Sequence, residues 1–261
     1  MKESIKNDQR FVNLKQSDLN MPVYRILPIK YLEEMYLNSE LILPKVTKWD
    51  DVFENFFLRS DFVIDGDIET DFLKEESELI FGQSWSFFED SDAMWRIYSK
   101  EHQSVRIKTT ITKLINPLTV TTIGDHFGII CDVCIGRVKY LNEQQFKSWV
   151  EKQEVLRNNL MNNIRESLFI KRKYFSHENE VRLIYFAEND DNRIIHRKNE
   201  MLAQFRINPK ELISEICFDP RVETYFFNSF KEYFVSKYSI PETIIVKSKL
   251  NDYEKLRFNI D

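Results

Sequence analysis

Apolar and polar residues alternate along many short stretches of the chain. Such alternation places one side of the backbone in a core and is typical of half-buried strands. Strand character is found in residues 23–27, 40–44, 79–87, 104–110, 128–141, 180–187, 201–207, 215–219 and 242–248. Residues 1–20 are polar, and we expect them to form a loose N-terminal arm.

Apolar residues at helical spacing predict a few helices between these strands. One carries Ile29, Leu32 and Met35 on its inner face. Ser91 is the expected N-cap of a short second helix, and another begins near residue 221. An apolar stripe over 142–172, opened by an Asn–Gln capping box, predicts one long helix.

The order of these elements predicts the fold class. Strands are many, helices are few, and the two do not alternate regularly as they do in parallel α/β proteins. We therefore expect an α+β protein with mixed, largely antiparallel sheets and one long helix inserted among them. With 43% hydrophobic and 14% aromatic residues, the 261-residue chain has enough apolar material for the core of a single domain, 1–261.

Glycine is scarce, which narrows the kind of nucleotide site that the chain can build. Only 5 of the 261 residues are glycine, well below the average of about 7%. None has the spacing of a dinucleotide fingerprint or a P-loop, in which glycine lets backbone N–H groups reach a phosphate. We therefore expect any nucleotide to be held by side chains.

The rest of the composition indicates a protein of the cytoplasm. No stretch approaches the roughly 20 apolar residues of a membrane helix, and the N-terminus lacks the apolar core of a signal peptide. Three cysteines do not make a disulfide framework. Cys131 and Cys134, beside His126, lack the further ligands of a zinc site, so no metal site is predicted. The formal charge of −5 still allows a local basic groove.

Two glutamates mark the start of the strand at 180–187. Side chains two residues apart share a face of a strand, so Glu178, Glu180 and Arg182 are expected on one side. Paired carboxylates at a strand end can divide the roles of base and charge stabiliser. The alternative, favoured when the sequence is taken alone, is an exposed polar strand face.

Three further places offer groups for ligand binding. Ser84 and Ser86 share a strand face and can position a sugar or an amide, or can be small outward residues of an edge strand. Arg25 interrupts an apolar strand and can grip a phosphate, or face solvent. Trp95 and Tyr98, three apart on a helix, can stack on a base or a nicotinamide ring, although such pairs are more often core.

Taken in order, Arg25, the Ser84 and Ser86 strand, and the Glu178 and Glu180 strand resemble the R-S-E signature of ADP-ribosyltransferases. The segments KWDDVFENFF, QSWSFFEDSDAMWRIYS, VRIKTT, FSHENEVRLIY and EICFDPRV are also similar to a bacterial family known only as a domain of unknown function. The transferase resemblance implies a split β-sandwich that binds NAD between two packed sheets without a glycine loop.

The transferase resemblance also implies a role for each residue. Arg25 would hold the phosphates and ribose of NAD, and Ser84 and Ser86 would orient the nicotinamide ribose. Glu180 would stabilise the oxocarbenium-like ribose as nicotinamide leaves. Glu178 would activate or position the acceptor.

The same resemblance suggests partners. The acceptor is expected to be RNA or DNA rather than protein, and a toxin or antiviral effector with an antitoxin partner fits this activity. The middle motif departs from the usual pattern, because a bulky tryptophan separates its two serines. The stretch 142–172 would be an insertion that serves as a lid or as an acceptor-binding element.

Two other functions remain open. One is a non-catalytic module that binds a protein or a nucleic acid through the aromatic residues of 49–56 and the basic stretch near Lys171. The other is a metal-dependent nuclease that combines the acidic residues of 50–54 with Glu178 and Glu180.

Overall fold

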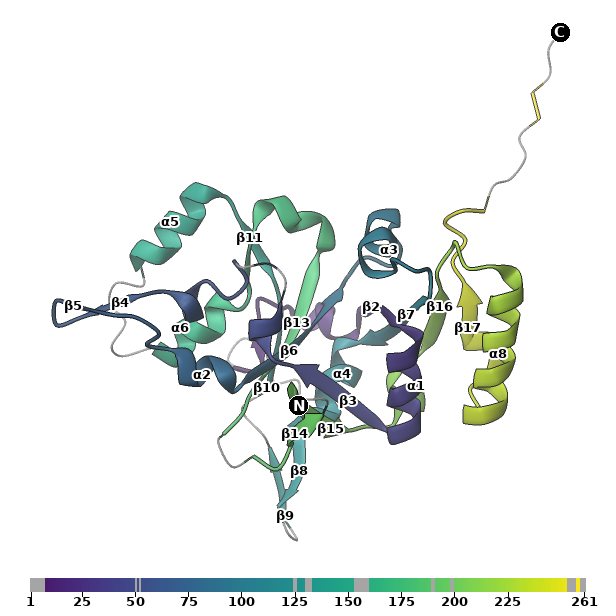
Figure 1. Ribbon diagram of the computed structural model, residues 1–261, viewed down its shortest axis with the longest axis horizontal. Coiled ribbons are helices and arrows are strands. Elements are labelled where there is room, and N and C mark those ends of the chain that lie inside the picture. The colour runs from purple at the N-terminus through teal and green to yellow at the C-terminus, as the bar shows by residue number, and fades with distance from the viewer. Residues whose placement is uncertain are drawn as a thin grey trace.

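An eight-stranded mixed sheet runs through the computed structural model, which describes residues 8–49, 51, 53–123, 126–129, 133–152, 160–188, 191–197, 200–252 and 257–258 (Figure 1). In spatial order its strands are β1 (Phe11–Val12), β10 (Val133–Arg137), β13 (Glu180–Phe186), β6 (Ile80–Ser86), β2 (Pro22–Pro28), β7 (Ser104–Thr110), β16 (Glu215–Phe218) and β17 (Ile245–Lys247). Its described pairs are antiparallel except at the two edges, where β1 and β17 run parallel to their neighbours.

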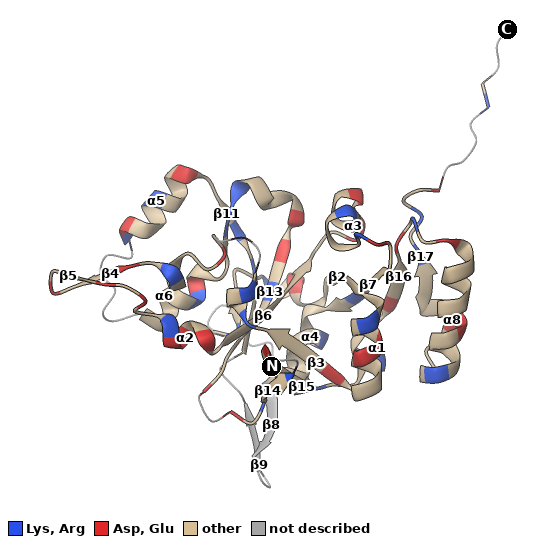
Figure 2. Ribbon diagram, in the orientation of Figure 1, with Lys and Arg blue, Asp and Glu red and all other residues tan. Residues whose placement is uncertain are grey.

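Smaller sheets and the helices surround this sheet. The other strands are β3 (Glu40–Pro44), β14 (Ile194–Arg197), β15 (Glu200–Arg206), β4 (Phe62–Ile64), β5 (Asp67–Glu69), β8 (Val120–Ile123), β9 (His126–Ile129), β11 (Lys139–Leu141) and β12 (Ile170–Arg172). The helices are α1 (Ile29–Asn38), α2 (Lys74–Glu78), α3 (Asp92–Tyr98), α4 (Ile111–Thr119), α5 (Glu143–Lys152), α6 (Leu160–Ser167), α7 (Pro209–Leu212) and α8 (Thr224–Tyr238). The β4–β5 hairpin extends from the body and carries acidic residues at its turn and on β5 (Figure 2). The predicted α+β class with largely antiparallel sheets is confirmed.

Local signals in the sequence placed several elements correctly. The strands predicted at 40–44 and 104–110 match β3 and β7, and α1 buries Ile29, Leu32 and Met35 as expected. Ser91 caps α3 by accepting a hydrogen bond from the backbone N–H of Met94. The capping box before α5 is also present, with Asn142 and Gln145 bonded to each other's backbone N–H groups.

Two predictions for less regular stretches were wrong. Residues 8–20 are not a loose arm, because β1 pairs with β10 and fixes this segment to the sheet edge, while residues 1–7 lie outside the described part of the chain. The long helix does not reach residue 172. It is described as α5 and α6, and residues 170–172 form β12, which pairs with β11. Backbone pairing with a distant strand therefore ends the helical pattern.

The alternating sides of β6 and β13 face different surroundings. The apolar odd-numbered residues of both strands, such as Phe81 and Leu183, belong to the main hydrophobic core. Even-numbered residues at one end, Ile80 and Ile184, pack in a second apolar cluster. Toward the other end this same face becomes polar, because Ser84 lies opposite Arg182 and Ser86 lies opposite Glu180. The polar motifs of the sequence therefore gather at one end of one sheet face.

The centre of the large sheet is open between two strands. β2 pairs with β7 along its whole length but meets β6 at a single position, Tyr24 with Ser86. The two strands therefore part beyond that pair, and residues on both sides of the gap line a cavity. None of the helices that the structure describes is long and apolar enough to cross a membrane.

Candidate functional site

The cavity beside the split between β2 and β6 has a volume of about 740 Å³, within the range of ligand sites. Residues from seven parts of the chain line it: β2, the segment 44–54, β6 with the following loop, α3, β7, β12, and the turn that leads into β13. We call it the main cavity. Six of the site residues predicted from the sequence lie in its wall, namely Arg25, Ser84, Ser86, Tyr98, Glu178 and Glu180.

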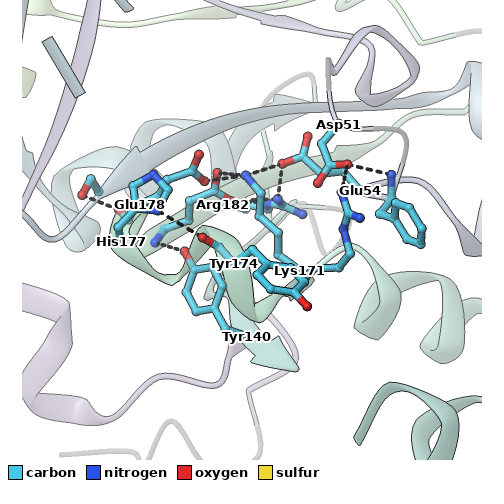
Figure 3. A network of polar contacts seen from close by, with 12 residues as sticks. Asp51, Glu54, Tyr140, Lys171, Tyr174, His177, Glu178 and Arg182 are labelled. Carbon is cyan, nitrogen blue, oxygen red and sulfur yellow. Dashed lines mark hydrogen bonds and ion pairs between the residues drawn. The ribbon is translucent and has the colours of Figure 1, made fainter. Parts of the chain in front are cut away.

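Three buried carboxylates and two buried cations form a cluster at one side of the main cavity (Figure 3). The ammonium nitrogen of Lys171 lies 2.9 Å from Glu54 and 3.1 Å from Glu180, and it also contacts Glu178. The guanidinium of Arg182 lies 2.6 Å from Glu54 and 2.7 Å from Glu180. We call these five residues the carboxylate cluster. The interpretation of Glu178 and Glu180 as an exposed strand face is wrong, because both are at most 5% exposed.

Arg182 also connects the carboxylate cluster to its surroundings. Its guanidinium donates a 2.7 Å hydrogen bond to the carbonyl of Leu168, just after α6, and lies 4.6 Å from the ring centroid of Trp49. Because Arg182 is completely buried, every one of these partners compensates its lost hydration. The cluster therefore holds α6, β13 and the segment around Trp49 together.

The glutamates of the carboxylate cluster differ in their affinity for protons. Burial raises the pKa of Glu178 to about 7, although its hydrogen bond with Lys171 acts in the opposite direction. Burial would also raise the pKa of Glu180, but the positive charges of Arg182 and Lys171 outweigh it and hold this pKa below its usual value. With all groups ionised the cluster has three negative and two positive charges, and it becomes neutral when Glu178 binds a proton. A carboxyl group that titrates near neutral pH is suited to proton transfer.

A short turn directs both glutamates toward Lys171. Residues Lys173–Glu178 form a 3₁₀ helix that ends at Asn179, whose positive φ of 43° is a conformation that asparagine tolerates better than most residues. The hydroxyl of Ser86 donates a 2.7 Å hydrogen bond to the carbonyl of Glu178 and accepts one from the N–H of Phe88. Basic residues lie at the start of this turn and acidic residues at its end (Figure 2). Ser86 therefore fixes the turn, and its hydroxyl is occupied by these contacts.

Arg25 and Ser84 offer free groups to the main cavity. Arg25 is half-buried, and its guanidinium has no hydrogen-bond or carboxylate partner among the residues that the structure describes. Burial lowers the pKa of Arg25 to about 10, so the side chain remains charged at neutral pH. The side chain of Ser84 is half-buried and likewise has no described partner. An unpaired cation in a cavity wall favours an anionic ligand.

The two aromatic residues predicted on one helix face are separated by the fold. Trp95 is completely buried, and its indole N–H donates to the carboxylate of Asp90. It does not line the main cavity, so no stacking role is proposed for it. Tyr98 is 43% exposed and lines the cavity mouth, and burial of its hydroxyl, with the charges of Glu178 and Glu180, raises its pKa to about 12. Helical spacing alone does not distinguish these two environments.

Trp49, which the sequence suggested only for a docking surface of the non-catalytic alternative, forms part of the cavity wall. Trp49 is half-buried and packs against β6 at Gly82. A Cβ atom at Gly82 would lie 2.9 Å from Cζ2 of Trp49, 2.9 Å from Cδ1 of Ile184 and 3.1 Å from the carbonyl oxygen of Leu183. Glycine at this position is therefore what lets the indole approach the sheet.

Gly82→Ala is expected to lower the free energy of unfolding by about 1–3 kcal/mol, because an added methyl group overpacks this contact. The indole of Trp49 must then move, which should also change the tryptophan fluorescence of the folded protein. Chemical denaturation measures the first effect. Trp49→Phe in the Gly82→Ala chain should recover part of the lost stability, and a Gly82→Ala protein as stable as the wild type would contradict this account of the contact.

Lys171 lacked a clear signal in the sequence, because it was expected at the end of a helix, where a lysine is commonplace. Glu54 was grouped with Glu178 and Glu180 in the nuclease alternative, but its ion pair with Arg182, 128 residues away, was not foreseen. The one available hint was that Glu180 and Arg182 share a strand face, because two charged side chains need buried partners if that face is covered. Because the covering segments come from elsewhere in the chain, these partners were not predictable from spacing.

The carboxylate cluster is not arranged as a metal site. Among the described residues, no group of three or more His, Cys, Asp or Glu side chains is placed to hold a metal ion. The ammonium of Lys171 lies between the three carboxylates, in the place that a cation would take. Asp50 lies outside the described residues, as do the side chains of His126 and Cys131. Cys134 is buried and free.

Comparison with known proteins finds a matching family model and a remote likeness to solved structures. Residues 94–183 match the model of the family described as "Protein of unknown function (DUF2971)", which confirms the expected resemblance to such a family over that stretch. The matched stretch contains Tyr98, Lys171, Glu178, Glu180 and Arg182. No curated protein matches the chain.

One of the similar structures is DarT of Thermus sp. 2.9, solved in complex with carba-NAD⁺. It covers 87% of this chain and 95% of that chain, with 11% sequence identity and a TM-score of 0.34. A likeness at this level assigns no activity to the chain.

Proposed function

We propose that the protein binds NAD in the main cavity and transfers ADP-ribose from it to an acceptor. The observation that carries this proposal is the unpaired guanidinium of Arg25 in the wall of a cavity that also holds the carboxylate cluster. The cation is available for a pyrophosphate, and the carboxylates are available for the ribose that reacts. Side chains alone supply these groups, which agrees with the scarcity of glycine.

The different proton affinities of Glu178 and Glu180 suit the two halves of the reaction. When the bond between ribose C1′ and the pyridinium nitrogen breaks, its electron pair goes to nicotinamide, and positive charge develops on the ribose. Glu180, which the neighbouring cations keep ionised, can stabilise that charge. An acceptor hydroxyl or amine then bonds to C1′ and loses a proton, which ionised Glu178 can accept.

The mouth of the main cavity supports a nucleic-acid acceptor over a protein acceptor. Lys48 and His177 are exposed and line the mouth, and Lys173 lies on the same turn as His177. The guanidinium carbon of Arg172 lies 3.9 Å from the ring centroid of Phe53, and Tyr174 is 77% exposed. Cations interleaved with aromatic rings bind single-stranded nucleic acid through phosphates and stacked bases. A role as a toxin or antiviral effector belongs to the same proposal.

The structure offers less support for the two other functions. A metal-dependent nuclease needs a cation between its carboxylates, and here Lys171 occupies that position. Of the aromatic residues of 49–56 proposed as a docking surface, Phe53 is exposed. Trp49 is half-buried, and Phe56 packs against the rings of Phe146 and Trp149, at centroid distances of 4.7 and 5.5 Å.

The test is thermal unfolding with and without millimolar NAD, combined with an assay for released nicotinamide. NAD should raise the melting temperature of the wild-type protein. Arg25→Ala should weaken NAD binding about ten- to a hundredfold, because it removes a charged hydrogen-bond donor. Arg206→Ala, an exposed arginine of β15 outside the cavity wall, is the matched control and should bind NAD like the wild type. If NAD still raises the melting temperature of Arg25→Ala as much as that of the wild type, NAD does not bind in this cavity.

A further inference from the structure

A second cavity lies between β11, one face of α5 and the segment at residues 12–13, with Glu166 of α6 and Ile170 of β12 also in its lining. Its volume is about 490 Å³, which is also within the range of small-molecule sites. Most of its polar groups are amides, a hydroxyl and amines, from Asn13, Lys139, Gln144, Gln145, Ser148 and Lys152. None of the residues that line the second cavity lines the main cavity or belongs to the predicted R-S-E motifs.

The second cavity is positively charged. Lys139 and Lys152 both line it, are exposed, and have no ion pair with any residue described in the structure. Glu166 is the acidic residue of its lining. Two ammonium groups against one carboxylate leave a net charge of +1, so the cavity attracts an anion.

We propose that the second cavity binds a nucleotide. The exposed amide of Gln144 combines a donor and an acceptor, which is the pattern that matches the edge of a nucleobase. The amide nitrogen of Asn13 donates to the carbonyl of Arg137, and the amide oxygen of Asn13 adds a further acceptor. Trp149 is half-buried, and its ring packs against the rings of Phe56 and Phe57. The part of the indole that lines the second cavity can contact the base. Lys139 and Lys152 supply the charge for the phosphate.

The second cavity and the main cavity are separated by the two-stranded β11–β12 sheet. Tyr140 pairs with Lys171 across this sheet, and both side chains lie on the side of the carboxylate cluster. There the hydroxyl of Tyr140 accepts a 2.8 Å hydrogen bond from the N–H of Glu180. The preceding pair, Lys139 with Ile170, lines the second cavity. A nucleotide bound there would lie against the strands that hold Lys171. The proposal does not depend on NAD transfer.

Binding of AMP, GMP, CMP and UMP is measured by calorimetry on the full chain and on Arg25→Ala. The Arg25→Ala chain suppresses binding in the main cavity, so the remaining affinity reports the second cavity. Lys139→Ala and Lys152→Ala should each weaken that affinity about tenfold, the loss of one charge-assisted contact. Lys147→Ala is the control, because Lys147 lies on the same helix, is exposed, and does not line the cavity.

Short single-stranded oligonucleotides distinguish a free nucleotide from a nucleotide unit of a strand. Mononucleotide binding that falls in Lys139→Ala and Lys152→Ala assigns the site to free nucleotides. Oligonucleotide binding alone, with the same dependence on both lysines, assigns it to a strand. The proposal is overturned if neither probe binds, or if binding is equal in the wild type, Lys139→Ala, Lys152→Ala and Lys147→Ala. All three lysines are exposed, so these variants should fold.

Discussion

Lys171→Met is expected to lower the free energy of unfolding by about 3–5 kcal/mol at pH 8, the cost of leaving buried charges without their partner. Lys171 is 5% exposed and contacts Glu54, Glu178 and Glu180. Without its ammonium, Arg182 alone must balance three carboxylates. Chemical denaturation at fixed pH measures the loss, and Glu178→Gln in the same chain should recover part of it by removing one of the unpaired charges.

The loss caused by Lys171→Met should also depend on pH. Removing the cation raises the pKa values of the three carboxyl groups in the folded protein, while those of the unfolded chain stay near 4.5. The folded protein then binds more protons than the unfolded chain between these values, so its stability rises as the pH falls through them. The difference from the wild type should therefore be smaller at pH 5.5 than at pH 8.

Lys45→Met is the matched control for Lys171→Met. Lys45 also pairs with a glutamate, Glu78, but that carboxylate is 52% exposed, so water replaces the lost partner. We expect a change below about 1 kcal/mol with little dependence on pH. Equal losses in Lys171→Met and Lys45→Met would mean that the carboxylate cluster is hydrated rather than buried.

Short-range patterns in the sequence were sufficient for the elements whose causes are local. The alternation of 104–110 depends on residues within one strand, and the cap of α3 depends on Ser91 and the backbone three residues later. In the same way Glu178 and Glu180 could be paired from their spacing. Arg25 could be selected because a charged residue in an apolar strand needs either solvent or a partner.

The parts of the site that were missed depend on contacts between distant segments. The helical pattern of 142–172 continues through residue 168, and only the pairing of β12 with β11 places Lys171 on a strand instead. Trp49 reaches the cavity wall because Gly82, 33 residues later in the printed sequence, leaves room for it. Trp95 and Tyr98 carry the same helical signal, but the tertiary packing buries only the first. Spacing therefore identified candidate groups without showing which of them share a cavity.

Glu180→Gln is expected to lower the rate of nicotinamide release from NAD by about 10²–10³-fold, the typical cost of removing one electrostatic contact to a developing charge. The variant leaves two carboxylates, Glu54 and Glu178, against Lys171 and Arg182, so the carboxylate cluster stays balanced and the fold should persist. Because the lost interaction forms mainly in the transition state, kcat should fall much more than KM rises. Glu40→Gln, in which an ion-paired glutamate outside the main cavity is replaced, should retain wild-type turnover.

The dependence of the transfer rate on pH should distinguish the role of Glu178 from that of Glu180. The pKa of Glu178 is about 7, so its ionised form, which accepts a proton, becomes the major form only above neutral pH. Transfer to an acceptor should therefore rise about tenfold per pH unit below pH 7 and level off above it. Glu178→Gln should remove this dependence together with most of the transfer, while NAD still raises the melting temperature. A Glu178→Gln protein that keeps the rise near pH 7 would assign the proton acceptor to another group.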